Sequence, residues 1–182
     1  MGSLVYEERV TSTGTTALFL ALALLFSLIF ITRQRADGPG VLGVVSLCLA
    51  TLFLFYAFNY RVLKITITTE ALHLRFGVFG WTVALEDLVG GQVDALPPLL
   101  RYGGAGIHFM TVRGRYRASF NMLEHPRIVL ALGRPRGWVR DLSFSTRHPD
   151  AVLRYLEAER EAVVRLDGSR SEQPAGSGGG EA

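Results

Sequence analysis

The sequence predicts a membrane α-hairpin joined to an α+β domain, in which a small antiparallel β-barrel or sheet of about seven strands is capped by one C-terminal helix. Three observations in the 182-residue chain predict this class. Two long stretches lack charged side chains, the residues after Arg61 alternate between apolar and polar, and the last periodic stretch opens with a helix-start signal. Hydrophobic residues make up 49% of the chain, which is too apolar for a disordered protein.

Two stretches are long and apolar enough to cross a bilayer. One lies between Arg9 and Arg33 and the other between Asp37 and Arg61, and neither contains Asp, Glu, Lys, Arg or His. A helix needs about 20 apolar residues to span the hydrocarbon, and lipid forces such a span to be helical because its backbone finds no other hydrogen-bond partners. The expected segments are an N-terminal segment at 1–14 and transmembrane helices at about 15–33 and 40–60.

A cleaved signal peptide is the alternative for the first span. Signal peptides start with basic residues and end at a small-residue cleavage site. In this chain two acids precede Arg9, and Thr32-Arg33-Gln34 follows the apolar core. The pattern favours a retained transmembrane helix.

The connector between the spans is short and contains the turn formers Asp-Gly and Pro-Gly. We therefore expect an antiparallel hairpin with both termini on one side of the membrane. Cytoplasmic flanks of membrane helices carry an excess of Lys and Arg. The terminal side has more basic residues than the connector, which predicts a multi-pass protein of the cytoplasmic (inner) membrane with both termini and the β-rich domain in the cytoplasm. The two groups are Arg9, Arg61, Lys64 and Arg75 against Arg33 and Arg35.

After Arg61 the apolar period changes to two, which is typical of half-buried strands. A helix begins at His148-Pro149-Asp150, because proline suits the first helical position and aspartate complements the positive end of the helix dipole. The tail is too polar and glycine-rich to order itself. The expected strands are Leu63–Ile67, Leu72–Phe76, Trp81–Leu85, Gly106–Val112, Tyr116–Met122, Arg127–Leu132 and Trp138–Phe144, in a domain at 61–166 followed by a disordered tail at 167–182.

A family resemblance follows from three segments behind the apolar hairpin: ITITTEALHLRFG (Ile65–Gly77), VALEDL (Val83–Leu88) and RYGGAGI (Arg101–Ile107). In this order they resemble the bacterial pleckstrin-homology-like (PH-like) domains found behind paired membrane helices. By pattern the resemblance covers about residues 61–165, and the connection from Gly90 to Gly106 fits it poorly. It implies a PH-like fold on the cytoplasmic face and brings no catalytic residues.

The sequence offers no catalytic or cofactor-binding constellation. The histidines lie far apart, with no spacing that places two imidazoles on one metal. Glu86 and Asp87 are adjacent, so on a strand they would point to opposite faces, and a turn is the simpler interpretation. The glycines from Gly103 to Gly106 lack the Lys and Ser/Thr of a phosphate-binding loop. We expect no metal, no cofactor and no enzymatic activity.

Arginine placement is the feature that most suggests a contact surface. Arg113, Arg115 and Arg117 recur at period two, which puts them on one face of a continuous strand. Beside an anionic leaflet such residues can rest on headgroups, although an ordinary solvated face gives the same pattern. Aromatic residues are not interleaved with them as nucleic-acid binding requires. The candidate lipid- or partner-contact residues are Arg113, Arg115, Arg117, Arg136, Trp138 and Arg140.

These features predict a membrane-anchored, non-enzymatic interaction or scaffold module that contacts anionic lipid or a membrane partner, without nucleic acid. The alternative is an accessory or assembly subunit of a membrane transporter or cell-envelope enzyme complex, acting through its transmembrane helices. Small residues in the second span would permit close approach of another helix. They are Gly43, Ser46, Cys48 and Ala50.

Overall fold

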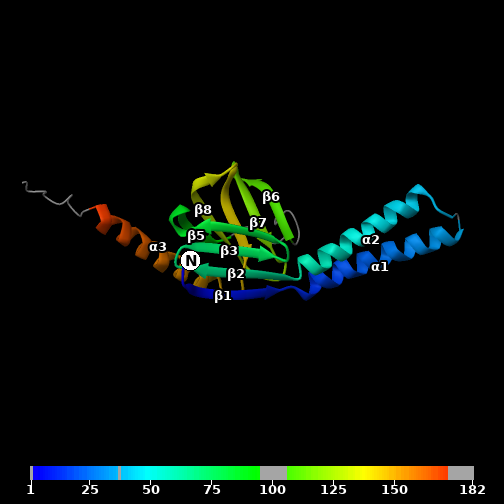
Figure 1. Ribbon diagram of the computed structural model, residues 1–182, viewed down its shortest axis with the longest axis horizontal. Coiled ribbons are helices and arrows are strands. Elements are labelled where there is room, and N and C mark those ends of the chain that lie inside the picture. The colour runs from blue at the N-terminus through cyan, green and yellow to red at the C-terminus, as the bar shows by residue number, and fades with distance from the viewer. Residues whose placement is uncertain (1, 37, 95–105, 172–182) are drawn as a thin grey trace, which may run out of the picture.

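A computed structural model describes residues 2–36, 38–94 and 106–171, with side chains as far as Ala162 in the last stretch. It consists of a helical hairpin, two β-sheets packed face to face, and a C-terminal helix (Figure 1). The elements in order are β1 (Leu4–Thr11), α1 (Thr13–Ala36), α2 (Val41–Asn59), β2 (Val62–Thr68), β3 (Ala71–Phe76), β4 (Phe79–Ala84), the 3-10 turn η1 (Leu85–Asp87), β5 (Leu88–Val93), β6 (Gly106–Val112), β7 (Arg115–Asn121), β8 (Arg127–Arg136), β9 (Val139–Ser145) and α3 (Pro149–Ser171).

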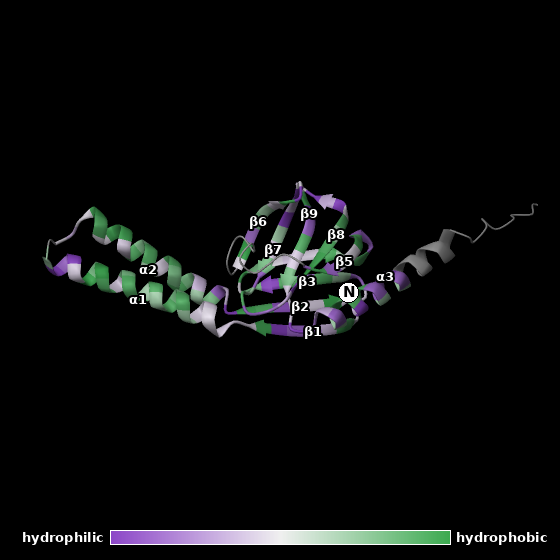
Figure 2. Cartoon of the chain, turned by 180° about the vertical axis from the view of Figure 1, so that it is seen from behind, coloured by the Kyte–Doolittle hydropathy of each residue, from purple (hydrophilic) through white to green (hydrophobic). Residues whose placement is uncertain are grey.

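The hairpin of α1 and α2 projects away from the sheets as a separate rod (Figure 1). Both helices are long and apolar enough to cross a membrane. Most of their residues are exposed, and the large exposed side chains are mainly leucine and valine. Figure 2 shows the ribbon of both helices coloured as hydrophobic along most of its length. The core helices of a soluble protein bury their apolar faces, whereas these helices leave them uncovered. The two apolar helices therefore suggest a membrane protein.

The strands of the first sheet run directly into the helices of the hairpin. Only Ser12 separates β1 from α1, and only Tyr60 and Arg61 separate α2 from β2. Ser12 caps α1, because its Oγ accepts a hydrogen bond from Thr15 N at 3.1 Å. At the other strand–helix junction, Asn59 Oδ1 accepts a hydrogen bond from Val78 N at 3.1 Å. No flexible linker lies between the sheet and the hairpin.

The two sheets have the orders β1-β2-β3-β4 and β5-β8-β9-β7-β6. The expected hairpins between 62 and 84 are present, with Ile65 opposite Leu74 and Leu72 opposite Val83. The expectation of a purely antiparallel sheet was wrong for one pair: β7 and β9 are parallel. The short turn after β7 does not make β7 and β8 neighbours, because β9 folds back between them and pairs with both.

The described residues form nine strands where about seven were expected, because β1 and β5 were missed. β1 was placed in an N-terminal segment outside the domain, but it pairs with β2 along its length. Its Glu8 is buried and accepts hydrogen bonds from Thr146 Oγ1 at 2.5 Å and from Arg147 N at 2.8 Å. The Tyr6 hydroxyl also donates to Glu8 at 3.0 Å, and burial together with this carboxylate raises the pKa of the hydroxyl. The domain therefore includes residues from both sides of the hairpin.

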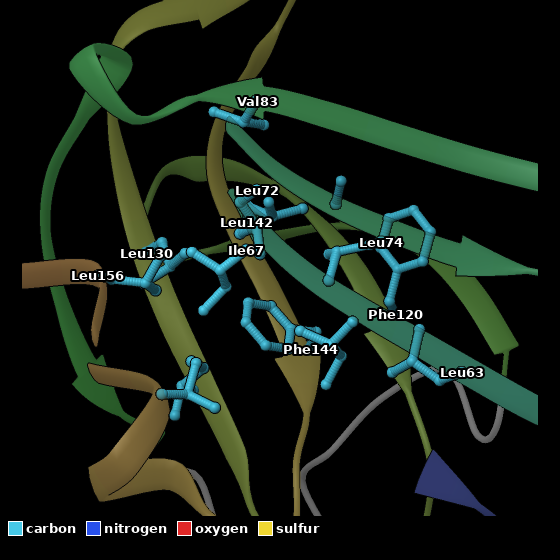
Figure 3. Packing of buried hydrophobic residues seen from close by; sticks show 14 of the residues in the cluster. Leu63, Ile67, Leu72, Leu74, Val83, Phe120, Leu130, Leu142, Phe144 and Leu156 are labelled. Atoms are coloured by element: carbon cyan, nitrogen blue, oxygen red, sulfur yellow. The ribbon is translucent and has the colours of Figure 1, made fainter. Parts of the chain in front are cut away.

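The core lies between the inner faces of the two sheets, and α3 closes one open corner (Figure 3). Its central residues include Leu74, Phe120 and Phe144. From α3, Val152 and Leu156 reach this core, and Tyr155 packs on Tyr6 of β1 with ring centroids 5.3 Å apart. The side-chain period thus explains both sheets: alternate residues face inward, as expected for strands with one covered face.

The tail was expected to be disordered from residue 167, whereas α3 continues to Ser171. An added helical residue needs only one further backbone hydrogen bond, so a helix can outlast its buried stripe. Residues 172–182 lie outside the described residues, as do positions 101–105 of the RYGGAGI segment.

Aromatic rings connect the interior of the hairpin with the core of the sheets. Phe53 lies between Phe26 and Phe19, with ring centroids 5.6 and 6.3 Å away. Phe19 then contacts Tyr60 at 6.5 Å, and Tyr60 meets Phe76 edge-on at 5.4 Å. Aromatic pairs at these separations contribute beyond the area that they bury. Continuous aromatic contacts therefore join the junction to the core.

We expect Gly77→Ala to destabilise this junction. Gly77 has φ +49°, and an added Cβ would lie 2.4 Å from Asn59 Oδ1 and 3.0 Å from Asn59 Cα. Backbone strain and the clash together should cost about 2–4 kcal/mol. Chemical denaturation of the full chain in detergent measures the loss. Gly114→Ala is the matched control: φ is +77° but nothing lies within 4 Å, so about 1 kcal/mol is expected. Equal losses would contradict the role given to the Asn59 contact.

Candidate ligand-binding cleft

The outer face of the five-stranded sheet is polar and yet buried. Core residues of β7 and β9 alternate with hydroxyl and amide side chains that point the other way. Ser143 Oγ donates to Ser119 Oγ at 2.9 Å, and Ser145 Oγ contacts Asn121 Oδ1 at 3.2 Å. These pairs face each other because β7 and β9 are aligned in parallel register. The polar row satisfies its own hydrogen bonds.

Charged residues continue this row toward the start of β7. Arg117 lies opposite Asp141 in the β7–β9 register. Arg115 Nε donates to Asp141 Oδ1 at 2.8 Å, and Arg115 Nη2 donates to Arg140 O at 3.1 Å. Arg127, which is 1% exposed, forms a short ion pair with Asp94 just after β5. Buried charges of this kind are stable only when they are paired.

Arg117 is the least compensated member of this cluster. The residue is 8% exposed, and its Nε and Nη1 atoms are buried without a hydrogen-bond partner in the described residues. Nη1 lies 3.6 Å from Asp94 Oδ2, and Nη2 lies 3.8 Å from Asp141 Oδ2. Both distances exceed hydrogen-bond length. An unpaired buried donor costs about 1–3 kcal/mol, so the carboxylates attract this guanidinium without satisfying it.

A cleft of about 460 Å³ opens beside Arg117. Arg113, Arg115 and Arg117 line it together with Asp141 and the amide of Gln92, and the remaining walls are small or apolar. These walls come from Gly90 and Gly91 of β5, Val112 of β6, and Val129 and Ala131 of β8. Small-molecule sites combine this kind of volume with apolar walls and a few convergent polar groups.

The structure divides the six predicted contact residues into two groups. Arg113, Arg115 and Arg117 line the same cleft, although Arg113 belongs to the β6–β7 turn with φ +50° and not to a continuous strand. Arg136 lies elsewhere, where it donates to Thr82 O and stands 5.4 Å from the centre of the Trp81 ring. Trp138 is 84% exposed in the β8–β9 connection. Arg140 is exposed on β9.

Sequence reasoning missed the acidic and basic partners of this cleft, Asp94, Asp141 and Arg127. Asp94 meets Arg127 where β5 pairs with β8, and Asp141 lies opposite Arg117 where β7 pairs with β9, so only the pairing of strands distant in sequence brings them together. A weak signal was present, because Asp141 is flanked by the apolar residues of an expected strand and occupies its outward position. No group of three or more His, Cys, Asp or Glu side chains gathers as metal ligands in the described part of the chain.

The small residues of α2 face its own partner helix. Gly43, Ser46 and Ala50 are buried, and a Cβ on Gly43 would lie 3.9 Å from the ring of Phe30 in α1. Cys48 is exposed on the opposite surface. The close-packing surface that an external helix would need is therefore occupied within the hairpin.

We expect Arg127→Met to be strongly destabilising, because it leaves Asp94 buried beside a weaker partner. Removing one member of a buried ion pair costs about 3–5 kcal/mol. Arg134→Met is the control, since Arg134 pairs with Glu86 at 3.3 Å on the exposed surface and such pairs are worth at most about 1 kcal/mol. Denaturation midpoints of the two variants in detergent measure the difference. Similar midpoints would show that the Asp94 pair is not effectively buried.

No protein-family model, curated protein or solved structure matches this chain.

Proposed function

We propose that this protein is a membrane-anchored, non-enzymatic interaction module that holds a β-rich binding domain at the surface of the bilayer. The observation that carries the proposal is the direct passage of β1 into α1 and of α2 into β2. With its 24 residues, α1 extends about 36 Å, enough for the hydrocarbon core. A domain held in this way keeps a fixed distance and orientation relative to the membrane.

Apolar side chains at the junction support this placement. Val78 in the β3–β4 turn contacts the end of α2, Phe79 begins β4 beside it, and both are exposed. Phe79 meets Phe55 of α2 edge-on at 6.2 Å. Exposed apolar and aromatic groups beside a transmembrane end are typical of the membrane interface. We infer that this edge of the domain sits at headgroup level.

The resemblance to bacterial PH-like domains is part of the proposal. Several features support it: the strand-turn-strand opening β2–β3, the VALEDL segment at the corner between the sheets, and the C-terminal helix α3. Two features are additions to that pattern, namely β1 from in front of the hairpin and the parallel pairing of β7 with β9.

Its contact is proposed to be a partner beside the membrane or anionic lipid, with the cytoplasmic face of an inner membrane as the location. Trp138, Arg140 and Arg136 gather at the β8–β9 connection, which lies at the side of the domain and not at its hairpin end (Figure 1). An exposed tryptophan between arginines is a composition common in protein–protein contacts. This position favours a partner over the lipid that the hairpin crosses.

Membrane anchoring is tested by alkaline extraction of cell membranes that contain the full chain. The protein should stay in the pellet and require detergent for release. Leu24→Arg combined with Leu47→Arg places a charge near the middle of each helix, at a cost of about 2.5–3.5 kcal/mol each, and should move the protein into the extractable or aggregated fraction. Leu24→Ala with Leu47→Ala is the matched control and should remain in the pellet. Release of the wild-type chain without detergent would overturn the proposal.

Orientation is tested with a reporter fused after Ala182. The excess of basic residues on the terminal side predicts a cytoplasmic C-terminus, so the reporter should resist proteases added to intact cells and become sensitive after permeabilisation. Arg33→Glu with Arg35→Glu strengthens the charge difference and should leave this result unchanged. Cleavage in intact cells would place the domain on the opposite side.

A further inference from the structure

We infer that the cleft beside Arg117 binds an oxyanion, the phosphate or carboxylate group of a small water-soluble compound. This inference names a ligand class for the proposed binding module, so it rests on the domain's having a binding function. It does not depend on the membrane anchor.

The charges that line the cleft are unbalanced. Three arginines, Arg113, Arg115 and Arg117, face it with one aspartate, Asp141, which leaves two positive charges in excess. The remaining acid, Asp94, forms an ion pair with Arg127, and Arg127 does not line the cleft. A concave surface with excess positive charge and low-dielectric walls concentrates anions.

Arg117 supplies the specific donor. Its guanidinium forms no hydrogen bond within the described residues, and the neighbouring carboxylate oxygens stop at 3.6 and 3.8 Å. Arginine presents a planar set of donors that fits carboxylate and phosphate groups. An oxyanion in the cleft would offer acceptors to the part of this guanidinium that lines the cleft, and the side chain is already largely desolvated.

The walls leave room for the rest of a ligand. A Cβ added at Gly90 would meet nothing within 4 Å, so β5 contributes open space at this point. Val112, Val129 and Ala131 provide apolar contact area around that space. A cleft of about 460 Å³ holds a compound of metabolite size and excludes a folded partner.

The position of the cleft favours a water-soluble ligand over a lipid headgroup. Gly106 at the start of β6 lies against Tyr60 of the hairpin junction. The cleft includes Val112 at the end of the same strand, about 20 Å further along. The arginines therefore lie away from the edge that meets the bilayer.

The test is calorimetric titration of inorganic pyrophosphate into the full chain in phosphatidylcholine nanodiscs. Saturable binding is expected, and Arg117→Met should weaken it by at least about tenfold. Gly90→Leu fills the open space without removing a charge and should abolish it. Arg154→Gln removes one exposed positive charge outside the cleft and should bind as the wild type does. Unfolding midpoints of each variant show whether it is folded.

The inference is overturned if pyrophosphate does not bind, or if folded Gly90→Leu binds as tightly as Arg154→Gln. Nanodiscs containing phosphatidylglycerol test the lipid source. Loss of pyrophosphate binding in them, while binding persists in phosphatidylcholine nanodiscs, would reassign the cleft to headgroups and overturn the water-soluble ligand. Alkaline extraction tests whether the hairpin anchors the protein in the membrane, and titration tests whether the cleft binds pyrophosphate. A negative result in one experiment therefore leaves the conclusion from the other unchanged.

Discussion

The pairing of β1 with β2 is the constraint on which the rest of this structure depends. These strands flank the hairpin in sequence, and their hydrogen bonds hold the two ends of α1 and α2 together. Paired strands lie about 4.8 Å apart, whereas packed helices lie about 8–10 Å apart. The distance between the two backbone segments must therefore increase over Ser12 on one side and over Tyr60–Arg61 on the other. The Ser12 cap and the Asn59 contact with Val78 fix both places where it does so.

The two faces of the five-stranded sheet bury different kinds of side chain. Its inner face is an ordinary apolar core, while its outer face buries serine, asparagine, arginine and aspartate side chains. Serine and asparagine satisfy one another across β7 and β9. The departure from this pattern at Arg117 coincides with the cleft. Beside the cleft, Arg117 Nε and Nη1 are buried without a hydrogen-bond partner in the described residues, and a desolvated donor held in place is what a preorganised ligand site requires.

Much of the fold could be predicted from local patterns. The length of the two uncharged stretches predicted both helices of the hairpin. The alternation of apolar and polar residues predicted the strands from Leu63 to Val83. Both predictions were possible because each pattern lies within one element. β1 was not predicted, because three consecutive charged residues, Glu7, Glu8 and Arg9, are typical of a solvated segment. Glu8 is tolerated inside because Tyr6 and the sequence-distant residues Thr146 and Arg147 donate to it. β5 escaped because its adjacent glycines resemble a turn.

The arginines of the candidate site could be predicted from the sequence, but their acidic neighbours could not. Period two correctly placed Arg115 and Arg117 on one face. Their acidic neighbours depend on the non-local pairing of β7 with β9, and the parallel direction of that pair leaves no local signal in the sequence. Whether the arginines meet solvent, lipid or a cleft depends on which strands lie beside β7 in the sheet. The sequence of β7 alone does not contain that information.

The chain of rings from Phe26 through Tyr60 to Phe76 has a mechanical consequence. Phe76 in turn stacks on Phe120, whose strand also carries Arg117. Close-packed interiors are stiff and transmit displacement instead of absorbing it. A change in bilayer thickness that tilts the two helices therefore loads the β-domain directly. The ring contacts therefore form a continuous packed path from the two helices in the lipid to the layer of core side chains beneath the cleft.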